Sequence, residues 1–331
     1  MPGYIFDGWF AHEALEEFDF ATTAITEDIT LTAHWTAPAP ITADVAAAMA
    51  HVSDAENPGA FTLLLGADVT LTGAAWTLAE NVHLTVEGIG ARRTITRSGT
   101  GNLFNINGAN RSLTLGDYIT LAGHGGNTLA LINVAGGGRL IMNAGAQITG
   151  NTASGGQQGG GVNVTGDGST FTMNGGKIWD NTATAATTGG GVRIAAGASF
   201  VMHAGAVIEG NTAENDHSGG GVLLVNAASI FRMLGGEIRG NSATGDTATV
   251  GGARISGGSL QIVNGVIYGY GADYANDGVT NDVLLLENAG TATLGTMVGD
   301  VFTPSLDDED DPVTLDSTDD TIRVVNGVLQ Q

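Results

Sequence analysis

Short runs of alternating apolar and polar residues recur along most of this chain. The apolar positions of one such unit are Val162, Val164, Phe171, Met173 and Ile178, and those of the next are Val192, Ile194, Phe200, Met202 and Ile208. Alternation with a period of two residues, in short runs broken by Gly, Asn and Asp, indicates β-strands with one buried face. Each unit is therefore expected to contain three strands and three corners.

Two motifs return at a fixed interval of 30 residues. Triple glycines begin at Gly159, Gly189 and Gly219, and asparagines that each follow an isoleucine by three residues stand at Asn151, Asn181, Asn211 and Asn241. A unit of this length cannot bury its apolar face alone, whereas stacked units bury it against one another, and parallel crossovers are overwhelmingly right-handed. The sequence therefore predicts an all-β fold: a right-handed parallel β-helix with about 30 residues per turn and about eight turns over residues 58–300.

The repeated glycines and asparagines are expected to have structural roles. Glycine adopts tight bends and positive φ without a steric penalty, which the corners of a coil require. The asparagine column from Asn151 to Asn241 should form a ladder of side-chain amides, each bonded to the turns above and below it. Both motifs are therefore assigned to the fold and not to a ligand site.

The pattern changes before the predicted coil, in residues 38–57. Residues 41–53 have apolar positions at helical intervals, and Thr42 suits an N-cap. These apolar positions are Ile41, Val45, Met49 and Val52. We expect a linker and a short helix that plugs the N-terminal end of the coil and protects its edge strands.

The last segment, residues 301–331, is expected to form an acidic loop and a C-terminal cap with a strand over 321–329. Its densest charge run contains Asp307, Asp308, Asp310 and Asp311. Carboxylates at this density are potential Ca²⁺ ligands, but the EF-hand spacing is missing. A solvated loop is the favoured interpretation, and no cofactor is expected.

Composition narrows the function classes. Charged residues make up 14% of the 331 residues, and the formal net charge is −23. Such a chain repels nucleic acid and acidic membrane surfaces. It contains no cysteine and therefore no disulfide or thiolate metal site. No apolar run approaches the length of a membrane span, so membrane insertion is not expected. We expect the chain to be a monomer.

Residues 1–37 differ from the rest in their aromatic density. The segment contains Gly3-Tyr4, Phe6, Gly8-Trp9-Phe10, Phe18-Asp19-Phe20 and the stretch from Ile29 to Trp35. In these residues it resembles the second half of an internalin-type B-repeat. The resemblance implies a small β-rich segment of a bacterial surface protein, cut inside its module.

Most of residues 58–270 resembles the pectate-lyase-like β-helices of bacterial surface or adhesin-like proteins, through the stretches 113–123, 140–153 and 171–183. Together the two resemblances imply an extracellular or cell-surface location. The secretion signal and the anchor would lie outside this chain, which begins with Met1-Pro2-Gly3.

Two functional hypotheses follow from the outward positions. Asp180 and Glu209 flank the asparagine column one turn apart, and paired carboxylates could act as acid and base in a polysaccharide lyase or glycoside hydrolase. The residues at the equivalent positions of the other units vary, however, and this variation favours a surface that is not catalytic. The outward positions Asn163, Arg193 and Leu223 form no regular threonine column of the ice-binding kind.

The favoured hypothesis is a non-catalytic surface module, either an adhesin-like binder or a rigid spacer, with a host or neighbouring-cell protein or glycan as its partner. One corner varies in sequence at constant length, over 154–158, 184–188 and 214–218, as ligand-facing loops do. The candidate ligand-binding residues are Trp179, Gln157, Gln158, Asn215, Asp216 and His217.

Overall fold

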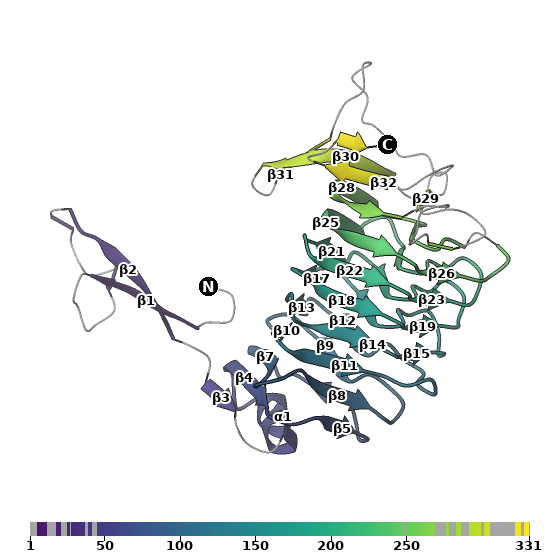
Figure 1. Ribbon diagram of the computed structural model, residues 1–331. Coiled ribbons are helices and arrows are strands. Elements are labelled where there is room, and N and C mark those ends of the chain that lie inside the picture. Colours follow the sequence, from purple (N-terminus) through teal and green to yellow (C-terminus); the bar gives the residue numbers. More distant parts are fainter. Residues whose placement is uncertain are drawn as a thin grey trace.

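The computed structural model describes residues 5–11, 18–20, 25–26, 28–36, 39–41, 45–247, 249–268, 276–277, 283–285, 291–298, 301–304, 322–325 and 328–330. These residues include a parallel β-solenoid of about seven turns with about 29 residues per turn. The predicted fold class is therefore confirmed. The turns stack from α1 (Val45–Ser53) at one end to β30 (Thr291–Val298) at the other (Figure 1).

Three long faces of parallel strands surround the core. The first face contains β4 (Gly59–Leu65), β7 (Val82–Gly88), β10 (Ser112–Leu115), β13 (Arg139–Met142), β17 (Thr170–Met173), β21 (Ser199–Met202), the first halves of β25 (Ile230–Arg239) and β28 (Ser259–Ile267), and β30. The second contains β5 (Val69–Leu71), β8 (Arg93–Arg97), β11 (Ile119–Ala122), β14 (Gln147–Thr149), β18 (Gly176–Trp179), β22 (Ala206–Glu209) and the second halves of β25 and β28. The third contains β6 (Trp76–Thr77), β9 (Phe104–Asn107), β12 (Ile132–Ala135), β16 (Val162–Thr165), β20 (Val192–Ala195), β24 (Val222–Leu224), β27 (Ala253–Ile255) and β29 (Val283–Leu285).

A fourth, very short strand completes each of the most regular turns, so the expectation of three strands per unit was wrong. These strands are β15 (Thr152–Ala153), β19 (Thr182–Ala183), β23 (Thr212–Ala213) and β26 (Ser242–Ala243). They pair in parallel with one another at the corner after the asparagine column. Two residues are too few for alternation to be visible in the sequence, although the repeated Thr-Ala marked the place.

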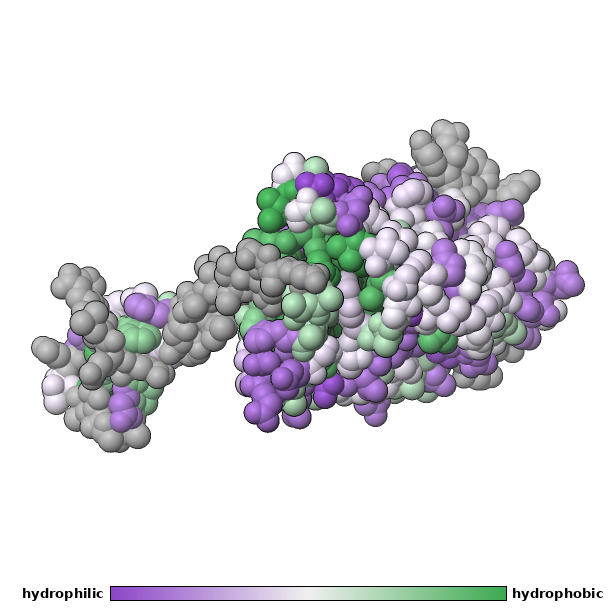
Figure 2. Space-filling view, turned by 90° about the horizontal axis from the view of Figure 1, so that it is seen from below, coloured by the Kyte–Doolittle hydropathy of each residue, from purple (hydrophilic) through white to green (hydrophobic). Residues whose placement is uncertain are grey.

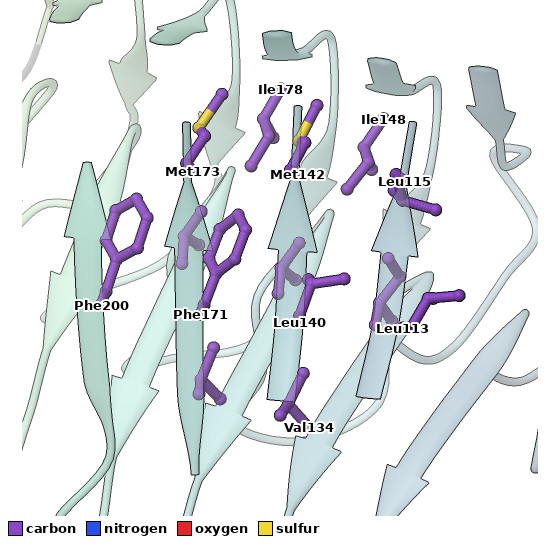
Figure 3. Packing of buried hydrophobic residues seen from close by; sticks show 14 of the residues in the cluster. Leu113, Leu115, Val134, Leu140, Met142, Ile148, Phe171, Met173, Ile178 and Phe200 are labelled. Carbon is purple, nitrogen blue, oxygen red and sulfur yellow. The ribbon is translucent and has the colours of Figure 1, made fainter. Parts of the chain in front are cut away.

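The core consists of columns of like residues held in register. Leu113 pairs with Leu140, which pairs with Phe171, and the column continues through Phe200 to Phe231. The rings of Phe171, Phe200 and Phe231 are fully buried and stack with centroids 4.7 Å apart, which is the spacing of neighbouring strands. Figure 3 shows the labelled members of this column on successive strands, pointing into the same interior. In-register stacking thus gives the rod a continuous core.

The triple glycines are explained by close backbone approach and not by positive φ. A Cβ atom at Gly159 would lie 1.9 Å from the carbonyl oxygen of Val162, and one at Gly189 would lie 2.0 Å from that of Val192. Neither of these glycines has positive φ. The expected positive φ occurs instead just before the ladder asparagines, as at Gly150 (φ 68°).

The N-terminal end of the core is covered by α1. Its buried Ala48, Met49 and Val52 pack against the core, as the helix prediction required. Ile41 was expected in this helix, but it lies in β3 (Ala39–Ile41), because pairing with β4 satisfies its backbone in the sheet. The proposed N-cap, Thr42, lies outside the described residues. Figure 2 views the molecule from this end and shows apolar surface beside polar surface.

Short antiparallel pairs occur beyond both ends of the solenoid. The expected β-rich N-terminal segment contains β1 (Ile5–Ala11) paired with β2 (Leu31–Thr36), drawn apart from the solenoid in Figure 1. At the other end, β31 (Val301–Pro304) pairs with β30. The expected capping strand is a hairpin of β32 (Ile322–Val325) and β33 (Val328–Gln330), and β32 pairs with the second half of β28.

Candidate functional site: a cleft on the third face

Outward positions of the third face are buried in the later turns. Asn163, Arg193, Leu223 and Arg254 occupy one column, each paired in register with the next. Their exposed fractions are 7%, 9%, 0% and 3%. These side chains were predicted to point away from the core, but the prediction did not include the cover that buries them.

The variable corner loops lie close to this column. A Cβ atom at Gly159, which ends the first of these loops, would approach the backbone nitrogen of Arg193 to 2.9 Å. Farther along, Arg254 Nη1 donates a hydrogen bond to the carbonyl oxygen of His217 at 3.0 Å. The close approach allowed by the triple glycines thus brings the loops against the third face.

A cleft of about 500 Å³ lies at Arg193. We name it the Arg193 cleft; it is lined by Gln157, Thr187, Arg193, Val225, Asn226, Ala227, Ser256 and Gly257. Two corner loops supply Gln157 and Thr187, β20 supplies Arg193, and the turns after β24 and β27 supply the rest. The cleft therefore collects residues that are far apart in sequence but adjacent across the stacked turns.

Arg193 is the charged group of this cleft. Within the described part of the chain, its guanidinium has neither a hydrogen bond nor an ion pair, and its Nε atom is buried. Burial lowers the pKa of Arg193 from its ordinary value, but a guanidinium remains protonated in proteins. The cleft thus contains a positive charge without a counter-charge among the residues that the structure describes.

A second unsatisfied polar atom lies on the neighbouring strand. Asn133 Nδ2 donates to Asn105 Oδ1 at 2.9 Å, and Asn163 Nδ2 donates to Asn133 Oδ1 at 3.0 Å. The next residue in this column is Arg193, and Asn163 Oδ1 is buried without a hydrogen-bond partner. The amide ladder of the third face therefore ends beside the arginine with an acceptor and a donor both unused.

The second face carries a charge cluster around Glu209. Lys177 Nζ lies 2.7 Å from Glu209 Oε1, and Arg239 Nη2 lies 2.8 Å from Glu209 Oε2. Burial raises the pKa of Glu209, but hydrogen bonds and charges from Lys177 and Arg239 outweigh burial and lower it overall. Lys177 Nζ also lies 5.0 Å from the ring centroid of Trp179, which is half-buried with Nε1 unpartnered. Trp179 and Glu209 are thus on a different face from the Arg193 cleft.

Asp180 occupies a corner of the backbone. It is exposed, its φ is 54°, and the equivalent residues Gly150, Gly210 and Gly240 have φ of 68°, 63° and 58°. Asp is among the few residues with a side chain that tolerate this left-handed region. The backbone N–H of Asp180 donates to the backbone carbonyl oxygen of Glu209 at 3.4 Å, but within the described residues no hydrogen bond joins the two side chains. A turn role therefore accounts for Asp180 without chemistry.

Most of the corner residues proposed as ligand contacts bond the loops to one another. Gln158 accepts a hydrogen bond from Ala130 N at 3.1 Å and donates one to Gly155 O at 3.0 Å. Asn215 Oδ1 accepts from Asp216 N, Asp216 Oδ1 accepts from Thr247 N, and the backbone N–H of His217 donates to Thr247 O. Of the six proposed contacts, Gln157 is the one that lines the Arg193 cleft.

The asparagine column forms the expected ladder. Asn181 Nδ2 donates to Asn211 Oδ1 at 3.0 Å, and Asn211 Nδ2 donates to Asn241 Oδ1 at 2.9 Å, while Asn151 N donates to Asn181 Oδ1 at 3.2 Å. Two further members were missed: Asn127 donates to Asn151, and Asn276 accepts from Asn241. Their spacings of 24 and 35 residues break the period that revealed the others.

The described residues contain neither a metal-binding cluster nor a membrane-spanning helix. No group of three or more His, Asp or Glu side chains among the described residues is placed to hold a metal ion. The calcium candidates Asp307, Asp308, Asp310 and Asp311 lie outside the described residues. In the part of the chain that the structure describes, no helix is long and apolar enough to cross a membrane.

The sequence did not predict that Arg193 and Asn226 line the same cleft. A signal for Arg193 was present, because an arginine replaces the asparagine that the same column carries at Asn133 and Asn163. Asn226 gave no such signal, since its turn has no fixed motif. No family model, curated protein or solved structure matches this chain.

Proposed function

We propose that this protein is a non-catalytic, adhesin-like surface module that binds its ligand in the Arg193 cleft. The observation that carries this proposal is Arg193 itself, which is 9% exposed and lacks a partner in the described residues. A largely buried guanidinium without a protein partner lowers the stability of the fold. Such a charge is understandable where a ligand supplies the missing counter-charge.

The solenoid suits a binding role because it is a stiff support. The stacked rings of Phe171, Phe200 and Phe231 and the asparagine ladder hold successive turns in register. A ligand that meets preorganised groups loses less free energy to ordering the protein. The proposed partner is a protein or glycan of a host or neighbouring cell, met by a monomeric extracellular module. The resemblances to B-repeats and to surface β-helices support this location.

A polysaccharide lyase or glycoside hydrolase is the second candidate. The proposed acid–base pair, Asp180 and Glu209, would carry that chemistry. Glu209 is bonded to both Lys177 and Arg239, and its lowered pKa favours the ionised form. A carboxylate held ionised is a poor proton donor at neutral pH, and one bonded to two cations is also a weakened base. This observation favours binding over turnover.

A paired assay tests the proposal. One oligosaccharide panel is used for glycan-array binding and for reducing-sugar and unsaturated-product release. We expect binding without turnover, and loss of binding in Ala227→Trp, which fills the cleft from an exposed position. Ala204→Trp, at an exposed turn outside the lining residues, is the matched control and should bind normally.

Two results would contradict the proposal. One is product release that disappears in Asp180→Ala or Glu209→Ala, which would identify an enzyme. The other is ligand binding that Ala227→Trp leaves unchanged, which would place the ligand elsewhere on the molecule.

A further inference from the structure

We infer that the Arg193 cleft takes a sugar acid with one carboxylate, as the terminal residue of an otherwise neutral glycan. This inference rests on the proposed function and specifies its ligand. The guanidinium, the charge of the whole chain and the lining of the cleft support it.

The guanidinium selects the charged group of the ligand. A guanidinium presents a planar fork of donors that matches a carboxylate with two parallel hydrogen bonds. Arg193 has this fork free of protein partners within the described residues, and its stem is buried. A carboxylate in the cleft would therefore satisfy a group that the protein leaves unsatisfied.

The net charge of the chain limits the ligand to a single negative charge. At −23, the field of the protein repels any ligand in proportion to the charge that the ligand brings. A polyanion would place many charges near this acidic surface, while one guanidinium would compensate only one of them. A single terminal carboxylate gains the contact with Arg193 at the smallest repulsion.

The remaining lining favours a ligand rich in hydroxyl groups. Gln157, Thr187, Asn226 and Ser256, which line the cleft, are uncharged hydrogen-bonding side chains. The volume of about 500 Å³ is within the usual range for small-ligand sites. A carboxylate with several hydroxyls around a compact ring combines these requirements, which defines a sugar acid.

The test uses monosaccharides as probes of the full chain. Glucuronate, galacturonate and N-acetylneuraminate are titrated by calorimetry, and glucose and galactose serve as neutral counterparts. We expect at least one acid to bind with a millimolar or tighter Kd, and its neutral counterpart to bind at least about tenfold more weakly. Arg193→Leu should weaken binding of the acid at least about tenfold, and Arg193→Lys should give an intermediate loss because it keeps the charge without the fork.

The variants are chosen so that folding does not obscure the result. Leu223 is already buried at the next position of the column, so a leucine at 193 has a stacking partner. Arg232→Leu on the first face removes the same charge and should leave binding unchanged. Arg232 donates to Gln261 and does not line the cleft.

Four results would overturn the inference. The first is that none of the three acids binds, and the second is that an acid and its neutral sugar bind equally. The third is that Arg193→Leu leaves binding unchanged. The fourth is that an oligogalacturonate or a glutamate-rich peptide binds at Arg193 at least about tenfold more tightly than the acids. If Ala227→Trp abolishes glycan binding while Arg193→Leu does not, the ligand class is wrong but the proposed function stands. If neither variant affects binding, both are wrong.

Discussion

Two columns of polar residues run along the same solenoid and differ in how completely they are satisfied. In the corner ladder, Asn211 Nδ2 donates to Ile178 O, Glu209 O and Asn241 Oδ1, and its Oδ1 accepts from Asn181. In the third-face column, Asn163 Oδ1 and Arg193 Nε are buried without partners. Both columns arise from the same stacking, yet only the first is complete within the described chain.

The difference distinguishes polar groups that hold the fold together from polar groups that remain available to a ligand. A buried polar group with all of its hydrogen bonds stabilises and specifies the fold, whereas an unpaired one lowers stability. A protein can retain such a group where a ligand completes it. The four variants below test this contrast, in order of decreasing effect.

The largest effect is expected for Asn211→Ala. The change removes one hydrogen bond from each of the carbonyl oxygens of Ile178 and Glu209 and from each of the buried side-chain amides of Asn181 and Asn241, so the free energy of unfolding should fall by about 3 kcal/mol or more. Urea denaturation measures it. Asn133→Ala removes the same side chain from the half-buried ladder of the third face and should cost less than about 1 kcal/mol. Equal losses would contradict the contrast between the columns.

Arg193→Leu should stabilise the protein. It removes a largely buried, unpaired guanidinium and places an apolar side chain beside Leu223, so we expect the free energy of unfolding to rise by about 1 kcal/mol. The same urea titration tests it, with Arg232→Leu as the charge-matched control. A clear destabilisation would assign Arg193 a structural role like that of the ladder.

Glu209→Gln should cost about 1 kcal/mol at neutral pH, because it breaks the ion pairs with Lys177 and Arg239. The pKa of Glu209 is lowered in the folded state. Its contribution is therefore present above the unfolded-state pKa and lost as the pH falls through the folded-state pKa. Stability curves of the wild type and the variant should converge in acid. A difference that is independent of pH would contradict this account.

The smallest effect is expected for Asp180→Gly. Glycine relieves the left-handed φ but increases the freedom of the unfolded chain, so a net gain of about 0.5 kcal/mol or less is expected. Thermal unfolding measures the gain, and glycan binding should not change. Loss of an activity in this variant would instead support the hydrolase or lyase hypothesis.

The repeat made the fold predictable, because stacked turns must present equivalent residues at equivalent places. Asn151 to Asn241 and the column through Phe171 and Phe200 followed directly from a constant spacing. Asn127 and Asn276 did not, because loops of other lengths precede and follow the regular turns.

The site was harder to predict than the fold because alternation reports only whether a side chain points into the core. It classed Arg193 as outward, which is correct for the strand but says nothing of a loop lying against that face. The cover depends on the absence of a Cβ at Gly159 and Gly189, a close approach between backbones that no hydrophobic pattern records. Gln157 was named as part of a variable loop of constant length, and the structure places it in the lining of the cleft.

The constant 30-residue register also bears on how such a molecule changes over generations. Gly159 bridges Gly189, which bridges Gly219, so the junction between one turn and the next is the same each time. Gene duplication or loss of one unit would recreate that junction and leave both caps untouched. The rod would then lengthen or shorten in steps of ~4.8 Å. The distance between the Arg193 cleft and either end of the rod could thereby change without a new fold.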